Sequence, residues 1–207
     1  TIAYRINGKT TYAMEGSIFI AGAGAPWLRD RMKFFKKAPE TAKIVKSLQN
    51  NTDIHLVPAF TGLGAPYWDA NARGVLSGIT RDTSPKEIVR ATIEAVAYQT
   101  HDLFEAMKHD GLRPKIVKVD GGMVMNNWFS QFLSDIVNVK VLRPKVQETT
   151  ALGAAFMAGL QIGVYKSLKD ISKNWHLDKK FSPKMQNPSR NKLLKGWSAA
   201  IKKTLSK

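Results

Sequence analysis

The 207-residue chain contains no cysteine. This absence excludes disulfide bonds, thiolate metal ligands and a thiol nucleophile, and it is typical of cytoplasmic proteins. No apolar run is as long as a membrane span, and no basic segment followed by an apolar core opens the chain. We therefore expect no membrane helix, no secretory signal and a cytoplasmic location. An initiator methionine is also lacking, which indicates a processed or partial chain.

Acidic residues are scarce relative to basic ones: the chain has 16 Asp and Glu and 32 Lys and Arg, which gives a net charge of +16. Such an excess of positive charge can indicate a nucleic-acid partner. From Tyr165 onward, however, the basic residues alternate with apolar ones, and few aromatic residues are placed to stack on bases. We expect a lysine-rich solvated surface and no nucleic-acid partner. A basic nucleic-acid-binding module remains the less favoured alternative.

Groups suited to metal binding or acid–base catalysis are few. The four histidines have no metal-ligand spacing, so we expect no protein metal site. Asp69, Asp82 and Asp102 are acid–base candidates only in principle, since nothing pairs them with a base or a metal. Glu94 is expected to be packed or ion-paired within a helix. No catalytic residue is assigned from the sequence.

The hydrophobic fraction of 43% is enough for a packed core. Apolar spacing and turn signals predict the following elements: a β-hairpin over 2–6 and 10–14, helical spacing over 17–35 interrupted by glycines and Pro26, a helix over 39–48, a strand over 54–57, a helix over 84–109, a strand over 116–119, a helix over 127–136, a strand over 139–142, a helix over 149–159, an exposed loop over 181–190 and a final amphipathic helix over 193–205. Short strands that alternate with helices indicate a parallel α/β layer.

Two glycine-containing segments could approach a ligand. Asp120-Gly121-Gly122, followed by Asn126, lies at a predicted strand-to-helix turn, where backbone amides can approach phosphate. The alternative is a plain turn with Asn126 as helix N-cap, and the spacing alone favours it. Gly22, within Ala21–Ala25, could line a nucleotide or let a helix pack closely. The residues alone favour neither of these two roles for Gly22. Neither of the two glycine-containing segments is a Walker A motif.

A third segment is a loop rich in glycine, proline and aromatic residues, Pro58–Asp69, which reads PAFTGLGAPYWD. It is followed by Gly74-x-Leu76-x-Gly78-Ile79 and then by Glu87-Ile88-x-x-Ala91-Thr92-Ile93-Glu94. The last two strings resemble a consensus pattern of the FGGY carbohydrate kinase family. The loop is similar to that of the glycerol-phosphorylating branch of the family. The resemblance also covers Thr150–Ala155 and runs over residues 1–163.

The resemblance implies an actin-like, ribonuclease H-like α/β domain, with a mixed sheet, helices on both faces and its first strands lacking. Family members transfer the γ-phosphate of ATP to a terminal hydroxyl between two such domains. The resemblance implies ATP or ADP as ligand, with Mg²⁺ held largely by phosphates and water. It places Gly22, Gly121, Gly122 and Asn126 at the nucleotide.

Several family features have no counterpart among these residues. The glycerol acceptor site, the general base and a phosphate-binding hairpin belong to a preceding N-terminal part in the family. We therefore expect residues 1–163 to form a nucleotide-binding domain, residues 164–207 to form a basic extension packed on it, and the chain alone to be inactive. Pro26 replaces a frequent glutamine, and Ser189 replaces an acidic residue of a regulatory loop. A homo-oligomer is possible, and a remnant that no longer binds nucleotide is the main alternative.

Overall fold

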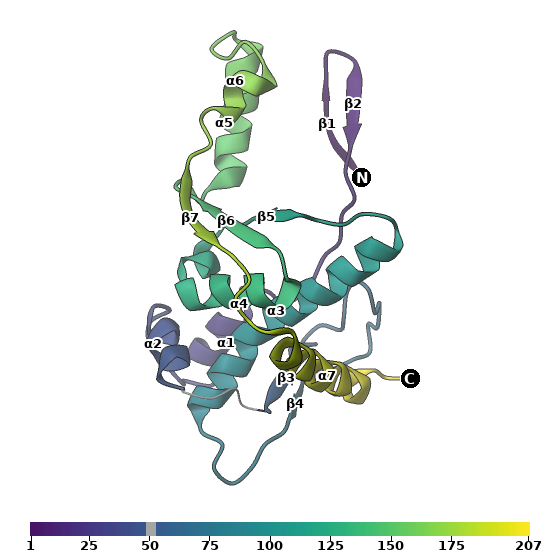
Figure 1. The fold of residues 1–207 in the computed structure, drawn as a ribbon, viewed down its shortest axis with the longest axis vertical. Helices are drawn as coiled ribbons and strands as arrows, with labels where there is room; N and C mark the ends of the chain where they lie inside the picture. The colour runs from purple at the N-terminus through teal and green to yellow at the C-terminus, as the bar shows by residue number, and fades with distance from the viewer. Residues whose placement is uncertain (49–52) are drawn as a thin grey trace.

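The computed structural model describes residues 1–48 and 53–207. Figure 1 shows a central body crossed by a long helix, with a hairpin and a helical arm projecting from one end. The helices are α1 (Gly24–Asp30), α2 (Glu40–Ser47), α3 (Pro85–His109), the 3₁₀ helix η1 (Gly122–Met125), α4 (Asn127–Val137), α5 (Thr149–Gln161), α6 (Leu168–Ser172) and α7 (Asn187–Thr204). The strands are β1 (Ile2–Ile6), β2 (Lys9–Tyr12), β3 (His55–Val57), β4 (Val75–Ser77), β5 (Ile116–Lys118), β6 (Lys140–Pro144) and β7 (Leu177–Phe181).

Helix α3 is the centre of the fold, and its start is set by local sequence. The side chain of Ser84 accepts a hydrogen bond from the backbone of Lys86, and Glu87 accepts one from the backbone N–H of Ser84 at 2.9 Å. This capping box, with Pro85 at the first helical position, explains why the predicted start of the helix is confirmed. The residues from Val89 to Gln99 are buried all round, because α1, α2, α4 and β3 pack against this part of the helix.

The strands form three small sheets among the described residues. Strands β1 and β2 make the predicted hairpin, β3 pairs antiparallel with β4, and β5, β6 and β7 form a mixed sheet. Within that sheet β5 and β6 are parallel, whereas β7 runs antiparallel to β6. The parallel layer is therefore limited to one strand pair, and strand β4 was not predicted.

Two predicted segments differ from the structure. The helical spacing over 17–35 gives only α1, because residues 19–23, which include Gly22, form bends and a turn instead of a helix. The loop predicted over 181–190 is shorter, since β7 ends at the buried Phe181 and α7 begins at Asn187. Asp135 holds the connection by accepting hydrogen bonds from the backbone N–H groups of Lys184 and Met185 at 2.6 and 3.2 Å.

Helix α7 joins the core formed by the earlier part of the chain. Trp197 is fully buried and stacks on Tyr98 of α3, with ring centroids 5.2 Å apart. The indole nitrogen donates a hydrogen bond to Asp102 at 2.6 Å. These contacts fix the C-terminal helix on α3. No helix within residues 1–48 or 53–207 has the length and hydropathy needed to cross a membrane.

Candidate functional site

A cavity of about 480 Å³ lies between the start of α1, the start of α2, α3 and the turn before α4. Its lining includes Gly22, Gly122 and Asn126. Two segments that lie about a hundred residues apart in the sequence therefore border the same space. The volume falls in the range of roughly 300–1,000 Å³ that is usual for small-molecule sites. The structure thus brings together three of the four residues predicted from the sequence.

The glycine backbone at this cavity is open to a ligand. Gly121 has φ +84°, a conformation that favours glycine, and it leads directly into η1. A Cβ atom built at Gly22, Gly121 or Gly122 would meet nothing within 4 Å. Gly121 borders the turn without lining the cavity, and its backbone N–H donates to the carbonyl of Gln147 at 3.4 Å.

The neighbouring Gly24 behaves differently from Gly22. A Cβ atom at Gly24 would lie 2.7 Å from Cγ2 of Thr92 in α3, so this glycine lets α1 and α3 approach closely. The two alternatives left open for Ala21–Ala25 therefore apply to different residues: Gly24 serves packing, and Gly22 faces open space.

Asn126 is the N-cap of α4. Its side-chain oxygen accepts hydrogen bonds from the backbone N–H groups of Trp128 and Phe129 at 3.0 and 3.4 Å. The capping role considered from the sequence is thus confirmed for the oxygen. The side-chain nitrogen donates to no group within the part of the chain that the structure describes, and the residue lines the cavity. One side chain can therefore both start the helix and offer a donor to a ligand.

The cavity lining holds no ionisable side chain; beyond the glycines and Asn126 it consists of Ala25, Pro26, Ala38, Pro39, Thr41, Ala42, Ile93, Met123 and Met125. No group of three or more His, Cys, Asp or Glu residues suited to a metal occurs within residues 1–48 and 53–207. Asp120 precedes the glycine turn and accepts a hydrogen bond from the hydroxyl of Thr149. The arrangement is suited to binding a ligand, and it offers no general base.

The lining from α2 and α3 was missed by the sequence reasoning. The lining residues Ala38, Pro39, Thr41 and Ala42 lie just before or at the start of the polar helix α2, and Ile93 is a core residue of α3. The residues at the start of α2 carry no motif, and the consensus-like string that contains Ile93 does not indicate a cavity, so only the packing of α2 against α3 could have revealed this part of the lining.

Three of the four carboxylates singled out from the sequence have structural roles, and the fourth, Asp82, is exposed. Glu94 is buried and pairs with Arg90 at 2.6 Å, as expected, while burial raises the pKa of its carboxyl group. Asp102 accepts hydrogen bonds from the hydroxyl of Tyr67 and the indole of Trp197 at 2.7 and 2.6 Å. Asp69 accepts hydrogen bonds from the backbone and the hydroxyl of Ser206, near the C-terminus.

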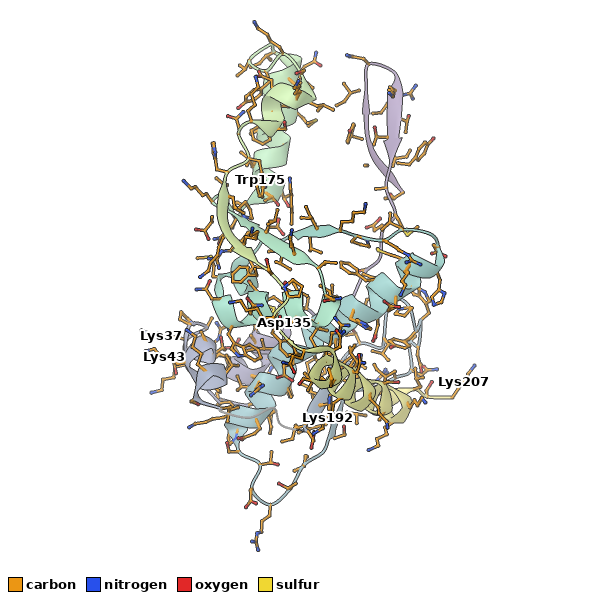
Figure 2. All side chains as sticks on the ribbon, viewed as in Figure 1. Lys37, Lys43, Asp135, Trp175, Lys192 and Lys207 are labelled. Atoms are coloured by element: carbon orange, nitrogen blue, oxygen red, sulfur yellow. The ribbon has the colours of Figure 1, made fainter. Side chains whose placement is uncertain are left out.

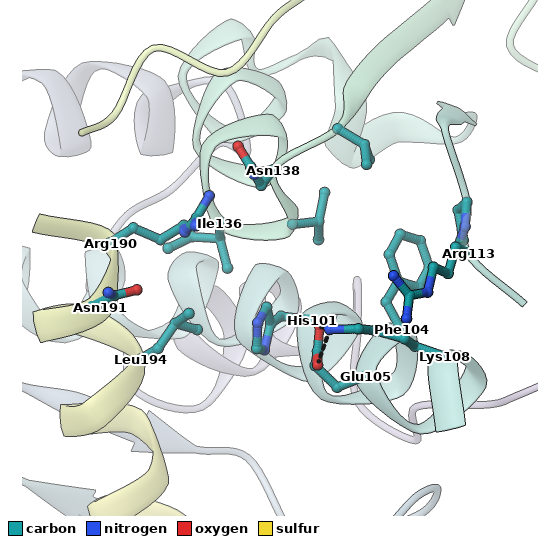
Figure 3. Close-up of a pocket in the computed structure, with 13 residues that line it drawn as sticks. His101, Phe104, Glu105, Lys108, Arg113, Ile136, Asn138, Arg190, Asn191 and Leu194 are labelled. Carbon is teal, nitrogen blue, oxygen red and sulfur yellow. Dashed lines mark hydrogen bonds and ion pairs between the residues drawn. The ribbon is translucent and has the colours of Figure 1, made fainter. Parts of the chain in front are cut away.

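A second cavity, of about 530 Å³, lies between the end of α3, residues 136–139 and the start of α7 (Figure 3). Its cationic side chains do not converge, because Arg190 and Arg113 lie at opposite ends and Lys108 pairs with Glu105 at 3.0 Å. None of the residues predicted for the nucleotide lines this cavity.

Comparison with solved structures identifies the fold class of the chain. The crystal structure of Plasmodium falciparum glycerol kinase with ADP matches all of this chain and 42% of its own, with a TM-score of 0.89 and 38% identity. Xylulose kinase from Lactobacillus acidophilus matches 90% of this chain and 38% of its own, with a TM-score of 0.75 and 24% identity. The chain thus has the α/β fold of the actin-like, ribonuclease H-like class.

Sequence comparison defines the family more narrowly. The model described as the C-terminal domain of the FGGY family of carbohydrate kinases matches residues 3–162. Glycerol kinase 1 of Pseudomonas aeruginosa is 52% identical over 206 residues, and glycerol kinase of Alcanivorax borkumensis is 54% identical over 202 residues. The chain therefore belongs to the FGGY family of carbohydrate kinases and corresponds to its C-terminal domain. It spans 42% and 41% of the length of these two relatives.

Proposed function

We propose that this chain is the nucleotide-binding part of a glycerol kinase. The complete protein would transfer the γ-phosphate of ATP to glycerol, giving glycerol 3-phosphate and ADP. The observation that carries the proposal is the cavity shared by Gly22, Gly122 and Asn126. It occurs in a chain that is similar over its whole length to a glycerol kinase solved with ADP.

The cavity residues suggest how a nucleotide would be held. The open backbone at Gly122, next to a helix N-terminus, suits phosphate groups, and Gly121 supplies the turn that leads into it. The apolar walls from Ala25, Pro39 and Ile93 suit a purine ring. The side-chain nitrogen of Asn126 can donate a hydrogen bond to either part. Mg²⁺ would be held by phosphates and water, since no cluster of ligating side chains occurs in the described ranges, and when bound it would neutralise phosphate charge.

The same lining explains why we propose that the chain alone is inactive. A cavity without an ionisable side chain can bind and orient a nucleotide, but it cannot take a proton from a hydroxyl group. The glycerol site and the base would lie in the part of the longer family proteins that this chain does not cover. Together the two parts would enclose the reaction.

The organisation of the protein forms part of the same proposal. Residues 1–163 would be the nucleotide-binding domain and residues 164–207 an extension packed on it. The end of the family match at residue 162 supports this boundary, and the burial of Trp197 against α3 supports the packing of the extension. A cytoplasmic location and a possible homo-oligomer are proposed from the family resemblance, and sedimentation of the purified chain would test the oligomer.

A titration with a fluorescent ADP analogue tests the location of the site. Gly122→Leu places a side chain in the cavity at a position where the backbone tolerates it, because no atom lies within 4 Å of a Cβ and φ is not positive. We expect binding to weaken by at least about tenfold, or 1.4 kcal/mol. Gly153→Leu is the matched control, since Gly153 lies in α5 with equally open surroundings and does not line the cavity. If both variants bind the ADP analogue with equal affinity, the nucleotide binds elsewhere. If the unchanged chain does not bind the analogue, the result favours the alternative of a kinase remnant that no longer binds nucleotide.

A further inference from the structure

The exposed face of α7 carries positive charge without a compensating acid. The helix contains no Asp or Glu, and its exposed lysines are Lys192, Lys195, Lys202 and Lys203. At about 100° per residue, these four side chains fall within an arc of roughly 100°. The opposite side of the helix is buried and consists of Leu193, Trp197, Ala200, Ile201 and Thr204. The four lysines therefore form a single row, which we call the lysine stripe, on the side of α7 that faces away from the core.

Most of the lysine stripe has no ionic partner within the protein. Lys192 pairs with Asp53 at 3.2 Å, and both side chains are largely exposed. Lys195, Lys202 and Lys203 form no ion pair with any residue that the structure describes. At the ends of α3 and α6, by contrast, an exposed lysine pairs with an acid three residues before it. The stripe thus keeps its positive charge available to a partner.

The fold itself gives no reason for a face of one sign. Lys202 and Lys203 lie in the last turn, where positive charge is favourable next to the helix C-terminus. Lys192 and Lys195 lie outside that turn and stand three residues apart, where two like charges destabilise a helix. A surface with acids and lysines interspersed would be equally soluble. The stripe is therefore suited to a partner that carries negative charge.

An exposed tryptophan lies beside the C-terminal end of the stripe. Trp68 is 71% exposed and lines the same hollow as Lys207. Its φ of +52° is unusual for a bulky residue, and the loop holds it there. The backbone N–H of Trp68 donates to the carbonyl of Gly64 at 2.9 Å, while Asp69 accepts a hydrogen bond from the backbone N–H of Ser206 at 2.7 Å. The loop therefore keeps a large amphipathic side chain in contact with solvent next to α7.

We propose that the lysine stripe and Trp68 form a surface that docks on an anionic lipid membrane. Lysine ammonium groups attract anionic head groups without requiring a fixed geometry, and tryptophan rings favour the interface between membrane and water. The exposed positions between the lysines include Ser198 and Ala199, which are small. The docking is therefore electrostatic and peripheral, and α7 stays folded on α3.

A nucleic acid fits this surface less well. Proteins read base edges mainly with arginine, asparagine and glutamine, and they stack bases on rows of aromatic rings. The lysine stripe contains none of these residue types, and the aromatic residue of α7, Trp197, is fully buried. A stripe of flexible point charges matches a layer of mobile head groups better than it matches bases.

Cosedimentation with lipid vesicles tests the proposal without a nucleotide. The vesicles consist of phosphatidylcholine alone or of phosphatidylcholine with about one third phosphatidylglycerol. We expect the chain to sediment only with the anionic vesicles at about 0.1 M salt, and to be released at about 1 M salt, which screens the attraction. Sedimentation with neither kind of vesicle, or equal sedimentation with both, would overturn the proposal.

Two triple variants that remove the same charge separate the stripe from the overall charge of the chain. Replacing Lys195, Lys202 and Lys203 together with glutamine should weaken binding to anionic vesicles by at least about tenfold. The matched control replaces three exposed lysines at and just before α2 with glutamine: Lys37, Lys43 and Lys46. Figure 2 shows the first two of these away from α7, whose ends are marked by Lys192 and Lys207. Equal losses in the two variants would assign binding to overall charge and overturn the proposal.

Tryptophan fluorescence shows which face meets the membrane. Brominated acyl chains quench a tryptophan that reaches the interface, and Trp68 is the exposed one of the five tryptophans. We expect anionic vesicles with brominated lipid to quench the unchanged chain, and Trp68→Phe to lose this quenching. Quenching that persists in the variant would place another face on the membrane and overturn the proposal.

A nucleic-acid partner is the last outcome that the experiment separates. Tighter binding to a short DNA or RNA duplex than to anionic vesicles at the same salt concentration, lost in the stripe variant, would identify a nucleic acid as the partner and overturn the proposal. The stripe lies outside the nucleotide cavity. The stripe variant should therefore bind the ADP analogue like the unchanged chain, so that membrane docking and nucleotide binding can fail independently.

Discussion

Asn126 caps a helix and is also proposed to bind the nucleotide. Its oxygen caps α4 through two backbone N–H groups, and its nitrogen has no partner within the described residues. Asn126→Asp keeps an acceptor at the cap, where a negative charge is favourable, but it places a carboxylate where phosphate is proposed to bind. We expect ADP affinity to fall by at least about tenfold with little change in unfolding free energy.

Asn126→Ala is the companion variant. It removes the cap as well as the donor, so the unfolding free energy should fall by about 1 kcal/mol in addition to the loss of affinity. Urea denaturation and fluorescence titration separate the two effects. An aspartate variant that binds ADP as well as the unchanged chain would remove Asn126 from the site.

His55 should make stability depend on pH. It is buried in β3, its Nε2 atom has no partner among the described residues, and burial lowers the pKa of the imidazole although nearby Asp53 acts in the opposite direction. A lowered pKa means that the unfolded chain binds a proton first. Unfolding free energy should therefore fall as the pH decreases below about 6.5, with a slope of at most about 1.4 kcal/mol per pH unit from this group.

The variant His55→Gln tests the origin of that slope. We expect denaturation midpoints measured between pH 7 and 5 to vary less in this variant than in the unchanged chain. His109→Gln, at an exposed position at the end of α3, should leave the slope as it is. If both variants retain the full slope, His55 is not its source.

Among the elements, α3, the loop Pro58–Asp69 and α7 meet at one carboxylate. Asp102 accepts hydrogen bonds from Tyr67 and Trp197. Asp102→Ala leaves two largely buried donors without an acceptor, and each costs about 1–3 kcal/mol. We expect a loss of about 2–5 kcal/mol in urea denaturation, against less than about 0.5 kcal/mol for the exposed Asp82→Ala. A loss as small as that of the control would mean that this junction contributes little to stability.

The elements also show what local sequence can predict. Helix α3 was predicted at both ends because Ser84, Pro85 and Glu87 form a capping box and Asp110-Gly111 follows. The loop predicted over 181–190 was too long at both ends, because Phe181 ends strand β7, which forms by pairing with β6 earlier in the chain, and α7 begins at Asn187. Pro188 indicated a loop, yet it stands in the first turn of α7, where proline is tolerated.

The candidate site was predictable only in part for a similar reason. The residues alone left Gly22 undecided and favoured a plain turn at Gly122, and only the resemblance to the family assigned both to one ligand. Their shared cavity depends on the packing of α2 against α3, and neither the polar sequence of α2 nor the consensus-like string in α3 indicates a cavity there.

At the scale of the whole molecule, the central claim is that this chain is the nucleotide-binding half of a kinase. The measurement that tests it most directly is a calorimetric titration of ADP with Mg²⁺ into the purified chain, followed by an assay for glycerol-dependent ADP release from ATP. We expect saturable binding of one nucleotide per chain without turnover, since the cavity has binding groups but no base. Absence of binding would contradict the claim of a self-contained nucleotide site, and turnover by the chain alone would contradict the claim that its acceptor site lies elsewhere.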